Sequence, residues 1–418
     1  MKKIAIIGSG ISGLTCAHLL HKNYDISVFE AGDYIGGHTA TKKVTVDDRE
    51  WTIDTGFIVF NDRTYPNFEK LMDKIGINKL ATEMSFSVTN LSNGLEYNGN
   101  NLNSLFAQRS NLFNVRFFML IYEILNFNKD CIKAWENNDI DKNTSLGEYL
   151  EQQQFSDYFC NNYLLPMGAA IWSSSLQDMR DFPLYFFIRF FYHHGLLTVN
   201  NRPQWYVIPN GSESYIKPLT KGFEDKIHLN SPVSEIYRQE KGVKLKVGEG
   251  AWQFFDEIIL ACHSDQAMRL LKDINDSEQA ILEQMHYQMN DVVLHTDTKL
   301  LPTQKRAWAA WNYRLSDDQN SPVAVTYNMN ILQRLPEDAP DICVSLNQTA
   351  AIDTDKILGQ YQYMHPVFNY DSLIAQVNRN QICGKNNTHF AGAYWYNGFH
   401  EDGVRSALDV CKRFGMLL

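Results

Sequence analysis

The chain has 418 residues, of which 44% are hydrophobic and 21% charged, so it is typical of globular proteins and longer than one core usually supports. Its formal net charge of -10, without any run of Lys and Arg, argues against a surface that binds nucleic acid. The seven cysteines are scattered without a C-x-x-C pair, which indicates reduced thiols in a cytoplasmic protein rather than a disulfide framework or a metal site.

Neither a secretory signal nor a transmembrane helix is expected. The first apolar run, residues 4–7, stops at Gly8, which is too early for the core of a signal peptide. No stretch of about 18 uninterrupted apolar residues occurs anywhere in the chain. Peripheral contact between a local patch and a membrane is left open.

The first thirty residues have the pattern strand, glycine turn, helix, strand, acid. Residues 4–7 and 26–29 predict two strands, and G-S-G-I-S-G at 8–13 leads into an apolar-periodic helix. The second strand ends at Glu30. This order predicts a dinucleotide site, and a plain βαβ unit without a ligand is the alternative.

If this segment binds a dinucleotide, each glycine and the acid has a definite structural role. Gly8 allows the tight turn, Gly10 lets a pyrophosphate approach the backbone, and Gly13 lets the helix pack closely on the strand. The helix N-terminus offers N–H groups to the phosphates. Glu30 lies where a carboxylate binds ribose hydroxyls and would repel a 2′-phosphate.

The segment A-G-D-Y-I-G-G-H-T at 31–39 resembles the extended fingerprint of flavoproteins related to amine oxidases, phytoene desaturases and protoporphyrinogen oxidase. The resemblance implies FAD rather than NAD. It also implies that Gly36 and Gly37 bring the backbone close to the phosphates and ribityl chain of the cofactor. His38 stands where the family more often has Arg, and an ordinary glycine loop is the alternative.

Residues 42–58 alternate like two strands around a polar turn, and residues 65–75 predict a helix. The segment D-T-G-F-I-V at 54–59 resembles the family's D-x-G segment beside the flavin ring, which implies a close-approach role for Gly56. The alternative is a strand edge with a bulge.

From about residue 102 to 197 the pattern is helical and strongly aromatic, above all at 185–192. Such stripes are more often core than cofactor contacts. Their density nevertheless favours a helical lobe around an apolar cavity. After this lobe the chain returns to the cofactor domain, where Val233 matches the family's adenine-contacting position, and where His263 follows a buried strand and is interpreted as a loop residue.

The segment H-F-A-G-A-Y-W-Y-N-G-F-H-E-D-G-V at 389–404 resembles the family's C-terminal signature. We expect a strand ending at Gly392 and a helix beginning near Gly403, whose N-terminus would stabilise the anionic reduced flavin. Three positions depart from the family's pattern, and the last of them, a missing Lys, weakens the interpretation as an oxygen-reactive amine oxidase. Ala393 replaces an acid or hydroxyl residue, Phe399 replaces a Tyr of the amine-polarising cage, and Asn290 stands where those oxidases carry a Lys.

Over most of its length the chain is most similar to a bacterial group of NAD/FAD-binding oxidoreductases within this superfamily. The resemblance implies an association with enzymes that make cyclopropane and methyl-branched fatty acids, including desaturase-like members. The segments that carry it are 54–59, 170–173, 194–197, 325–330, 365–368 and 398–403.

These patterns predict an α/β protein: a two-domain, Rossmann-like FAD-binding fold with an interleaved substrate domain made of a mixed sheet and a helical lobe. The FAD-binding domain is expected at 1–75, 205–275 and 380–418, and the substrate domain at 76–204 and 276–379.

FAD is the expected cofactor and no metal is expected. The predicted FAD-binding residues are Gly8, Gly10, Ile11, Ser12, Gly13, Glu30, Ala31, Gly36, Gly37, His38, Thr39, Gly56, Phe57, Ile58, Val233, Gly392, Ala393, Phe399, His400, Gly403 and Val404. His400 is also the candidate catalytic base, because a neutral imidazole can take up a proton near neutral pH. The alternative is a structural hydrogen-bonding role for this side chain.

We expect an FAD-dependent oxidoreductase that removes a hydride equivalent from a small, apolar or lipid-like substrate, such as a modified fatty acyl chain. The alternatives are a flavin-dependent amine oxidase, a non-redox flavoprotein resembling UDP-galactopyranose mutase, and a flavin-binding assembly subunit. A mutase of this kind needs an arginine-rich site for a diphosphate, and the two candidate arginines, Arg189 and Arg202, are too few to make one. The sequence identifies neither the electron acceptor nor the oligomeric state.

Overall fold

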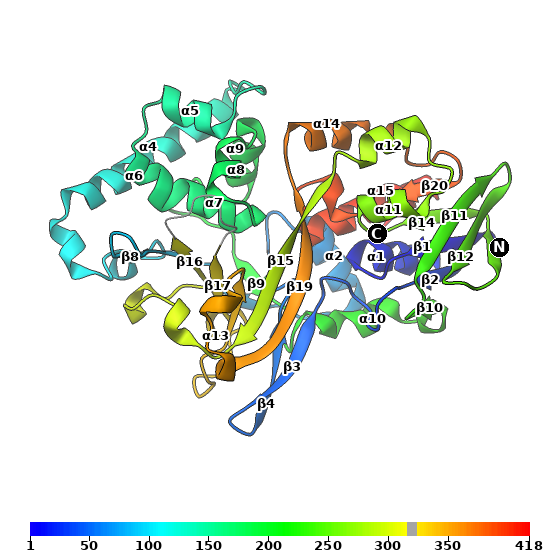
Figure 1. Ribbon diagram of the computed structural model, residues 1–418, viewed down its shortest axis with the longest axis horizontal. Coiled ribbons are helices and arrows are strands. Elements are labelled where there is room, and N and C mark those ends of the chain that lie inside the picture. Colours follow the sequence, from blue (N-terminus) through cyan, green and yellow to red (C-terminus); the bar gives the residue numbers. More distant parts are fainter. Residues whose placement is uncertain (316–323) are drawn as a thin grey trace.

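The computed structural model describes residues 1–315 and 324–418. In Figure 1 the strands β1 (Lys3–Ile7) and β2 (Asp25–Phe29) lie at one end of the molecule, and the helices from α4 (Val115–Glu136) to α9 (Leu184–His193) lie at the other. The long strands β15 (His286–His295) and β19 (Ile357–Val367) lie between them. The predicted substrate domain contains residues 316–323, which lie outside the described part of the chain.

A parallel sheet organises the end that holds the N-terminus. Its described strands, in the order β10-β2-β1-β14-β20, all pair in parallel. They are β1 (Lys3–Ile7), β2 (Asp25–Phe29), β10 (Ile227–His228), β14 (Glu257–Leu260) and β20 (Thr388–Phe390). The chain leaves β1 toward β2 on one side, while β14 pairs on the other, so the carboxyl end of β1 is a topological switch point where such sheets bind ligands.

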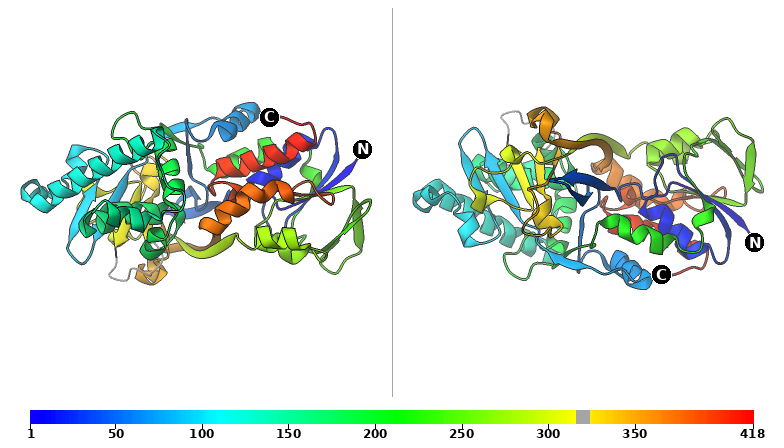
Figure 2. Two further views of the ribbon diagram at one scale, coloured as in Figure 1. Left: turned by 90° about the horizontal axis from the view of Figure 1, so that it is seen from above. Right: turned by 90° about the horizontal axis from the view of Figure 1, so that it is seen from below.

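Helices and a second small sheet cover this parallel sheet. The helices α1 (Ile11–Leu20) and α15 (His400–Arg413) pack against each other beside it (Figure 2). An antiparallel sheet packs against β1 and β14, and its strands are β11 (Val233–Gln239), β12 (Gly242–Val247) and β13 (Trp252–Phe255).

A mixed sheet forms the middle of the molecule, in the described order β19-β15-β18-β17-β16-β7-β8. Neighbouring strands pair antiparallel, except for the parallel pair β16–β7. The strands are β7 (Phe86–Asn90), β8 (Leu95–Asn98), β15 (His286–His295), β16 (Trp311–Leu315), β17 (Val325–Asn328), β18 (Cys343–Leu346) and β19 (Ile357–Val367).

A helical lobe packs on one end of the mixed sheet around an aromatic core, in which Phe127, Phe159 and Phe187 are fully buried. Its helices are α3 (Leu102–Leu105), α4 (Val115–Glu136), α5 (Leu146–Gln152), α6 (Asp157–Phe159), α7 (Leu165–Trp172), α8 (Leu176–Arg180) and α9 (Leu184–His193).

The remaining described strands and helices are short. The strands are β3 (Thr41–Val46), β4 (Arg49–Asp54), β5 (Val59–Asn61), β6 (Leu80–Thr82) and β9 (Trp205–Val207). The helices are α2 (Pro66–Ile75), α10 (Ile216–Thr220), α11 (Ser264–Leu270), α12 (Asp276–Leu282), α13 (Met329–Leu332) and α14 (Tyr370–Asn378).

The predicted fold class is confirmed, while the domain boundaries stay a prediction. Two predicted element ends are wrong. Helix α15 begins at His400 rather than near Gly403, because the Asp402 carboxylate accepts the Phe399 N–H and caps the helix three residues earlier. The last strand ends at Phe390 rather than Gly392. None of the described helices is long and apolar enough to span a membrane.

Candidate functional site

One cavity of about 990 Å³ runs from the carboxyl end of the parallel sheet into the space between the mixed sheet and the helical lobe. The volume is at the upper end of the roughly 300–1,000 Å³ of typical ligand sites, which leaves room for a cofactor and a substrate. Ile7 and Glu30 lie at one end of its lining and Trp172 and Leu125 at the other.

The glycine turn after β1 forms the first part of the wall. Gly8 has a φ of +105°, and a Cβ there would lie 2.7 Å from the Ala261 carbonyl oxygen. A Cβ at Gly13 would lie 2.0 Å from the Gly8 carbonyl oxygen, which explains why helix and turn require glycine there. A Cβ at Gly10 would meet nothing within 4 Å, so this backbone faces open space in the cavity.

Helix α1 points its N-terminus at that space. Its N-cap is Gly10, which supplies no side-chain cap, and its first turn holds no acidic residue. Among the described residues no hydrogen-bond partner is found for the N–H groups of Ile11 and Ser12. An uncapped helix N-terminus of this kind favours a phosphate.

Glu30 lies at the end of β2 and lines the cavity. Its carboxylate accepts the Ser9 N–H at 2.8 Å, the Ser9 hydroxyl at 2.7 Å and the Gly32 N–H at 2.9 Å. The carboxylate is therefore fixed beside the glycine turn, where a ribose would donate to it.

We expect Glu30→Gln to weaken FAD binding by about 1.5–3 kcal/mol, since hydrogen bonds to a charged group contribute about that much. Fluorescence titration of the apoprotein with FAD measures the change. Asp25→Asn, at the other end of the same strand, is the matched control and should bind FAD as the parent does. Equal affinities for the Glu30→Gln variant and the parent would contradict the ribose assignment.

The structure brings most of the predicted cofactor residues into the wall of this one cavity. Those that line it are Gly8, Gly10, Ile11, Ser12, Glu30, Ala31, Gly37, His38, Gly56, Phe57, Ile58, Val233, Gly392, Ala393, Phe399 and His400. The others, which lie behind this wall, are Gly13, Gly36, Thr39, Gly403 and Val404. The Gly56 backbone packs closely against the backbone of His38, because a Cβ at Gly56 would lie 2.2 Å from the His38 carbonyl oxygen.

His400 is the first residue of α15 and its ring stacks on Phe57 with centroids 3.7 Å apart. Its Nε2 lies 3.2 Å from the Thr39 hydroxyl and 3.3 Å from the Tyr215 hydroxyl. Burial holds the pKa of His400 well below its usual value. The base role of His400 stays a prediction, and these contacts favour the structural alternative, because the ring nitrogen is already engaged by two hydroxyls.

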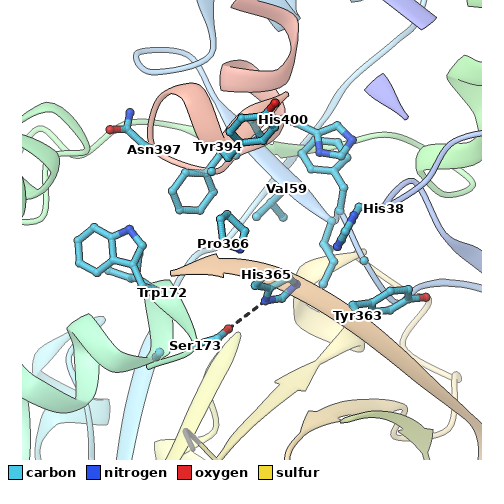
Figure 3. Close-up of a pocket in the computed structure, with 18 of the residues that line it drawn as sticks. His38, Val59, Trp172, Ser173, Tyr363, His365, Pro366, Tyr394, Asn397 and His400 are labelled. Carbon is cyan, nitrogen blue, oxygen red and sulfur yellow. Dashed lines mark hydrogen bonds between the residues drawn. The ribbon is translucent and has the colours of Figure 1, made fainter. Parts of the chain in front are cut away.

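Three other histidines, His38, His263 and His365, line the same cavity. Figure 3 shows His38 and His365 in its wall. The His38 ring centroid lies 5.6 Å from that of His365 and 6.3 Å from that of His263. The His38 Nε2 is buried without a hydrogen-bond partner in the described structure. Within the described residues, no cluster of three or more His, Cys, Asp or Glu side chains is arranged to hold a metal ion.

His365, on β19, forms a pair with Ser173 at the end of α7 (Figure 3). The His365 Nδ1 lies 3.1 Å from the Ser173 hydroxyl oxygen, and among the described residues no hydrogen bond to its Nε2 is found. Ser173 is buried and has a left-handed backbone, with φ +54°. A non-glycine residue in this region stores strain that often marks a functional site.

The part of the cavity beyond the histidines, between the mixed sheet and the helical lobe, is what we call the chamber. Among the described lining residues of the whole cavity, Glu30 at the nucleotide end is the only acidic one. The chamber is lined mainly by aliphatic and aromatic side chains, among them Phe86, Ile121, Ile124, Leu125, Met167, Ile171, Trp172, Phe190, Leu196 and Trp311.

FAD fits the residues present. The open space at Gly10, the uncapped N-terminus of α1 and the Glu30 carboxylate match a pyrophosphate and a ribose. The buried, unpartnered His38 Nε2 offers a further polar contact inside the cavity. The nucleotide end would therefore hold the ADP part, with the flavin directed toward the chamber.

The buried titratable groups around the cavity should make stability depend on pH. Burial lowers the pKa of His38 to about 3, aided by the neighbouring histidines, and lowers the pKa values of His194 and His365 to about 4. Between about pH 4 and 6.5 the unfolded histidines therefore bind protons that the folded ones do not. Their contribution to stability is complete above pH 6.5 and is lost as the pH falls. Burial raises the pKa values of Asp54 to about 6 and Asp402 to about 7, which opposes this trend in part.

We expect the free energy of unfolding to be lower at pH 5 than at pH 7, as measured by denaturant titration. His194→Gln should remove about 2 kcal/mol of this difference, because pH 5 lies about 1.5 pH units below the pKa of an unfolded histidine and each pH unit contributes about 1.4 kcal/mol. An unchanged difference in the His194→Gln variant would show that the folded histidine titrates normally.

Sequence reasoning did not assign Ser173, His263 or His365 a role in the site. Ser173 and His365 both lie in segments that carry the resemblance to the bacterial group, at 170–173 and 365–368. Their place in these segments is the sequence feature that could have pointed to them. Their pairing across 192 positions of chain is a tertiary contact that no local pattern encodes.

A family model described as "Flavin containing amine oxidoreductase" matches residues 11–346 of the chain. No curated protein matches the sequence significantly. Solved structures that share the fold include the following three, each matched over 99% of this chain. A CLA-producing fatty acid isomerase from P. acnes is 15% identical (TM-score 0.71, 98% of that chain covered). Cyclohexylamine oxidase from Brevibacterium oxydans IH-35A is 14% identical (TM-score 0.68, 99% covered). Putrescine oxidase bound to putrescine is 14% identical (TM-score 0.67, 98% covered).

Proposed function

Because the chain belongs to the flavin-containing amine oxidoreductase family and is an FAD-dependent oxidoreductase, we propose that it oxidises an apolar, uncharged substrate of the fatty acyl class. The reaction would be a dehydrogenation that introduces a carbon–carbon double bond. When bound, FAD supplies the acceptor for a hydride equivalent.

The chamber carries this proposal. Its described lining is mainly aliphatic and aromatic, with Asn128 and Arg202 among the polar exceptions, and no acidic side chain there could neutralise an ammonium group. A cationic amine entering the chamber would lose its hydration without gaining a counter-ion, which is costly. An acyl chain would instead gain from burial of its methylene groups, by about 0.8 kcal/mol each. The fatty acid isomerase, which shares the fold, is named for a substrate of this class.

His365 and Ser173 are the proposed proton-handling pair. In the tautomer whose Nδ1–H donates to the Ser173 hydroxyl oxygen, His365 keeps a lone pair on Nε2 in the cavity. One substrate C–H bond would lose its electron pair and hydrogen to the cofactor, and the neighbouring carbon would lose a proton to His365 Nε2. Burial lowers the pKa of His365 to about 4, so the imidazole is neutral at pH 7 and one of its ring nitrogens is unprotonated.

Anaerobic reduction of the bound flavin tests the substrate class. The holoenzyme is mixed with fatty acyl compounds of varied chain length and branching, and in parallel with mono- and diamines of matched length. We expect loss of the oxidised flavin absorption with an acyl compound and none with the amines. Reduction by amines alone would make the chain an amine oxidase.

A further inference from the structure

The outer face of helix α4 is unusually apolar for a surface helix. Six exposed side chains at its N-terminal end form what we call the α4 patch: Phe113, Val115, Phe118, Met119, Tyr122 and Leu125. Phe113 is 90% exposed and Val115 77% exposed. Phe113 lies just before the helix, and the five residues from Val115 to Leu125 follow the spacing of a single stripe along it.

The α4 patch is additional to the face by which α4 packs on the lobe. Phe117, Leu120 and Phe127 point the other way and are buried in the aromatic core. A surface helix normally pairs one apolar face with a polar one, so apolar side chains on both faces indicate a second contact. Figure 2 shows that α4 lies at the end of the molecule farthest from the N-terminus, where another body could reach it.

The charge around the α4 patch is opposite to that of the whole protein. Residues 106–125, which span the α4 patch, contain two basic residues, Arg109 and Arg116, and one acidic residue, Glu123, so this segment is net basic although the chain carries a net charge of -10. Anionic lipid headgroups attract such a local basic segment, while the acidic remainder of the protein would be held away from the same surface. Charge thus favours an anionic bilayer over a second copy of this acidic chain.

The α4 patch adjoins the mouth of the cavity. Leu125 and Val199 both line the cavity and are about half or more exposed, so they lie at its opening. Ile121 and Ile124, on the same helix, line the chamber. A body that covers the α4 patch therefore lies directly over the entrance.

From this geometry we infer that the α4 patch docks on the surface of an anionic lipid bilayer, with α4 lying along the interface and the chamber opening toward the lipid. Arg109 and Arg116 would contact headgroups while the apolar stripe enters the acyl boundary. The inference goes beyond the proposed reaction, because docking on lipid can be measured without turnover.

Cosedimentation of the holoenzyme with vesicles tests this inference. The parent should bind phosphatidylglycerol vesicles and bind phosphatidylcholine vesicles less. Phe113→Ser/Phe118→Ser should lower the partition coefficient at least about tenfold. Arg109→Gln/Arg116→Gln should lower it about fivefold for each arginine on phosphatidylglycerol alone. Flavin content and melting temperature confirm that each variant is folded.

The matched control is Ile374→Ser/Val377→Ser, which removes two apolar side chains that are 60% and 81% exposed on α14. This control should bind vesicles as the parent does. The inference is overturned if the parent fails to bind phosphatidylglycerol, or if the Phe113→Ser/Phe118→Ser variant binds as well as the parent. It is equally overturned if sedimentation without lipid shows that the α4 patch instead holds two copies together.

Discussion

Replacing Gly10 with valine should give a folded protein that contains no FAD. A Cβ at this position meets no atom within 4 Å, so the valine side chain disturbs no packing of the protein itself. It would project into the part of the cavity where the N-terminus of α1 would receive the pyrophosphate. The loss should therefore fall on binding and leave folding nearly unchanged.

Flavin absorbance of the purified variant and circular dichroism measure the two effects separately. Gly99→Val is the control, because its Cβ would also meet nothing within 4 Å and it lines the same cavity away from the nucleotide end. This control should keep its flavin. Gly13→Val should behave differently from both, since its Cβ would collide with the Gly8 carbonyl and destabilise the fold. A fully flavinated Gly10→Val protein would refute the N-terminal assignment.

Replacing His365 with glutamine should leave FAD bound and slow flavin reduction by about 10²–10⁴-fold, the usual contribution of a general base. Glutamine can still hydrogen-bond to Ser173 but cannot take up a proton. Stopped-flow measurement of anaerobic reduction gives the rate without the reoxidation step. His263→Gln is the control, since His263 also lines the cavity, where it stacks on Tyr287.

The same measurement on His400→Gln decides between the two candidate bases. The structure favours a rate within a few-fold of the parent, because the His400 Nε2 is held by Thr39 and Tyr215. If His400→Gln is slow and His365→Gln is fast, the base is His400 and the His365 assignment is wrong.

The sequence predicts the nucleotide end of the cavity well because its determinants are local. The strand, the glycine turn and Glu30 lie within thirty residues, and their spacing alone fixes the geometry of the turn. The hairpin β3–β4 and helix α2 are likewise encoded by short periodic segments.

The chamber is less predictable because its parts come from distant segments. Ser173 and His365 meet only when α7 packs beside β19, and the strain at Ser173 is invisible in the residue type. The start of α15 also escaped prediction. The first residue of this helix is set by a side-chain cap: the carboxylate of Asp402, three residues after Phe399, accepts the Phe399 N–H. The sequence does not show that the α4 patch is exposed, because its aromatic and aliphatic residues have the same spacing as residues buried in a core.

The balance between flavin reduced and product formed tests the proposed reaction most directly. The holoenzyme is mixed anaerobically with an equimolar acyl substrate, and the organic product is analysed by mass. We predict one molecule of product, lighter by two hydrogens, for each flavin reduced. A product of unchanged mass, formed repeatedly while the flavin stays oxidised, would contradict the dehydrogenation and identify an isomerase.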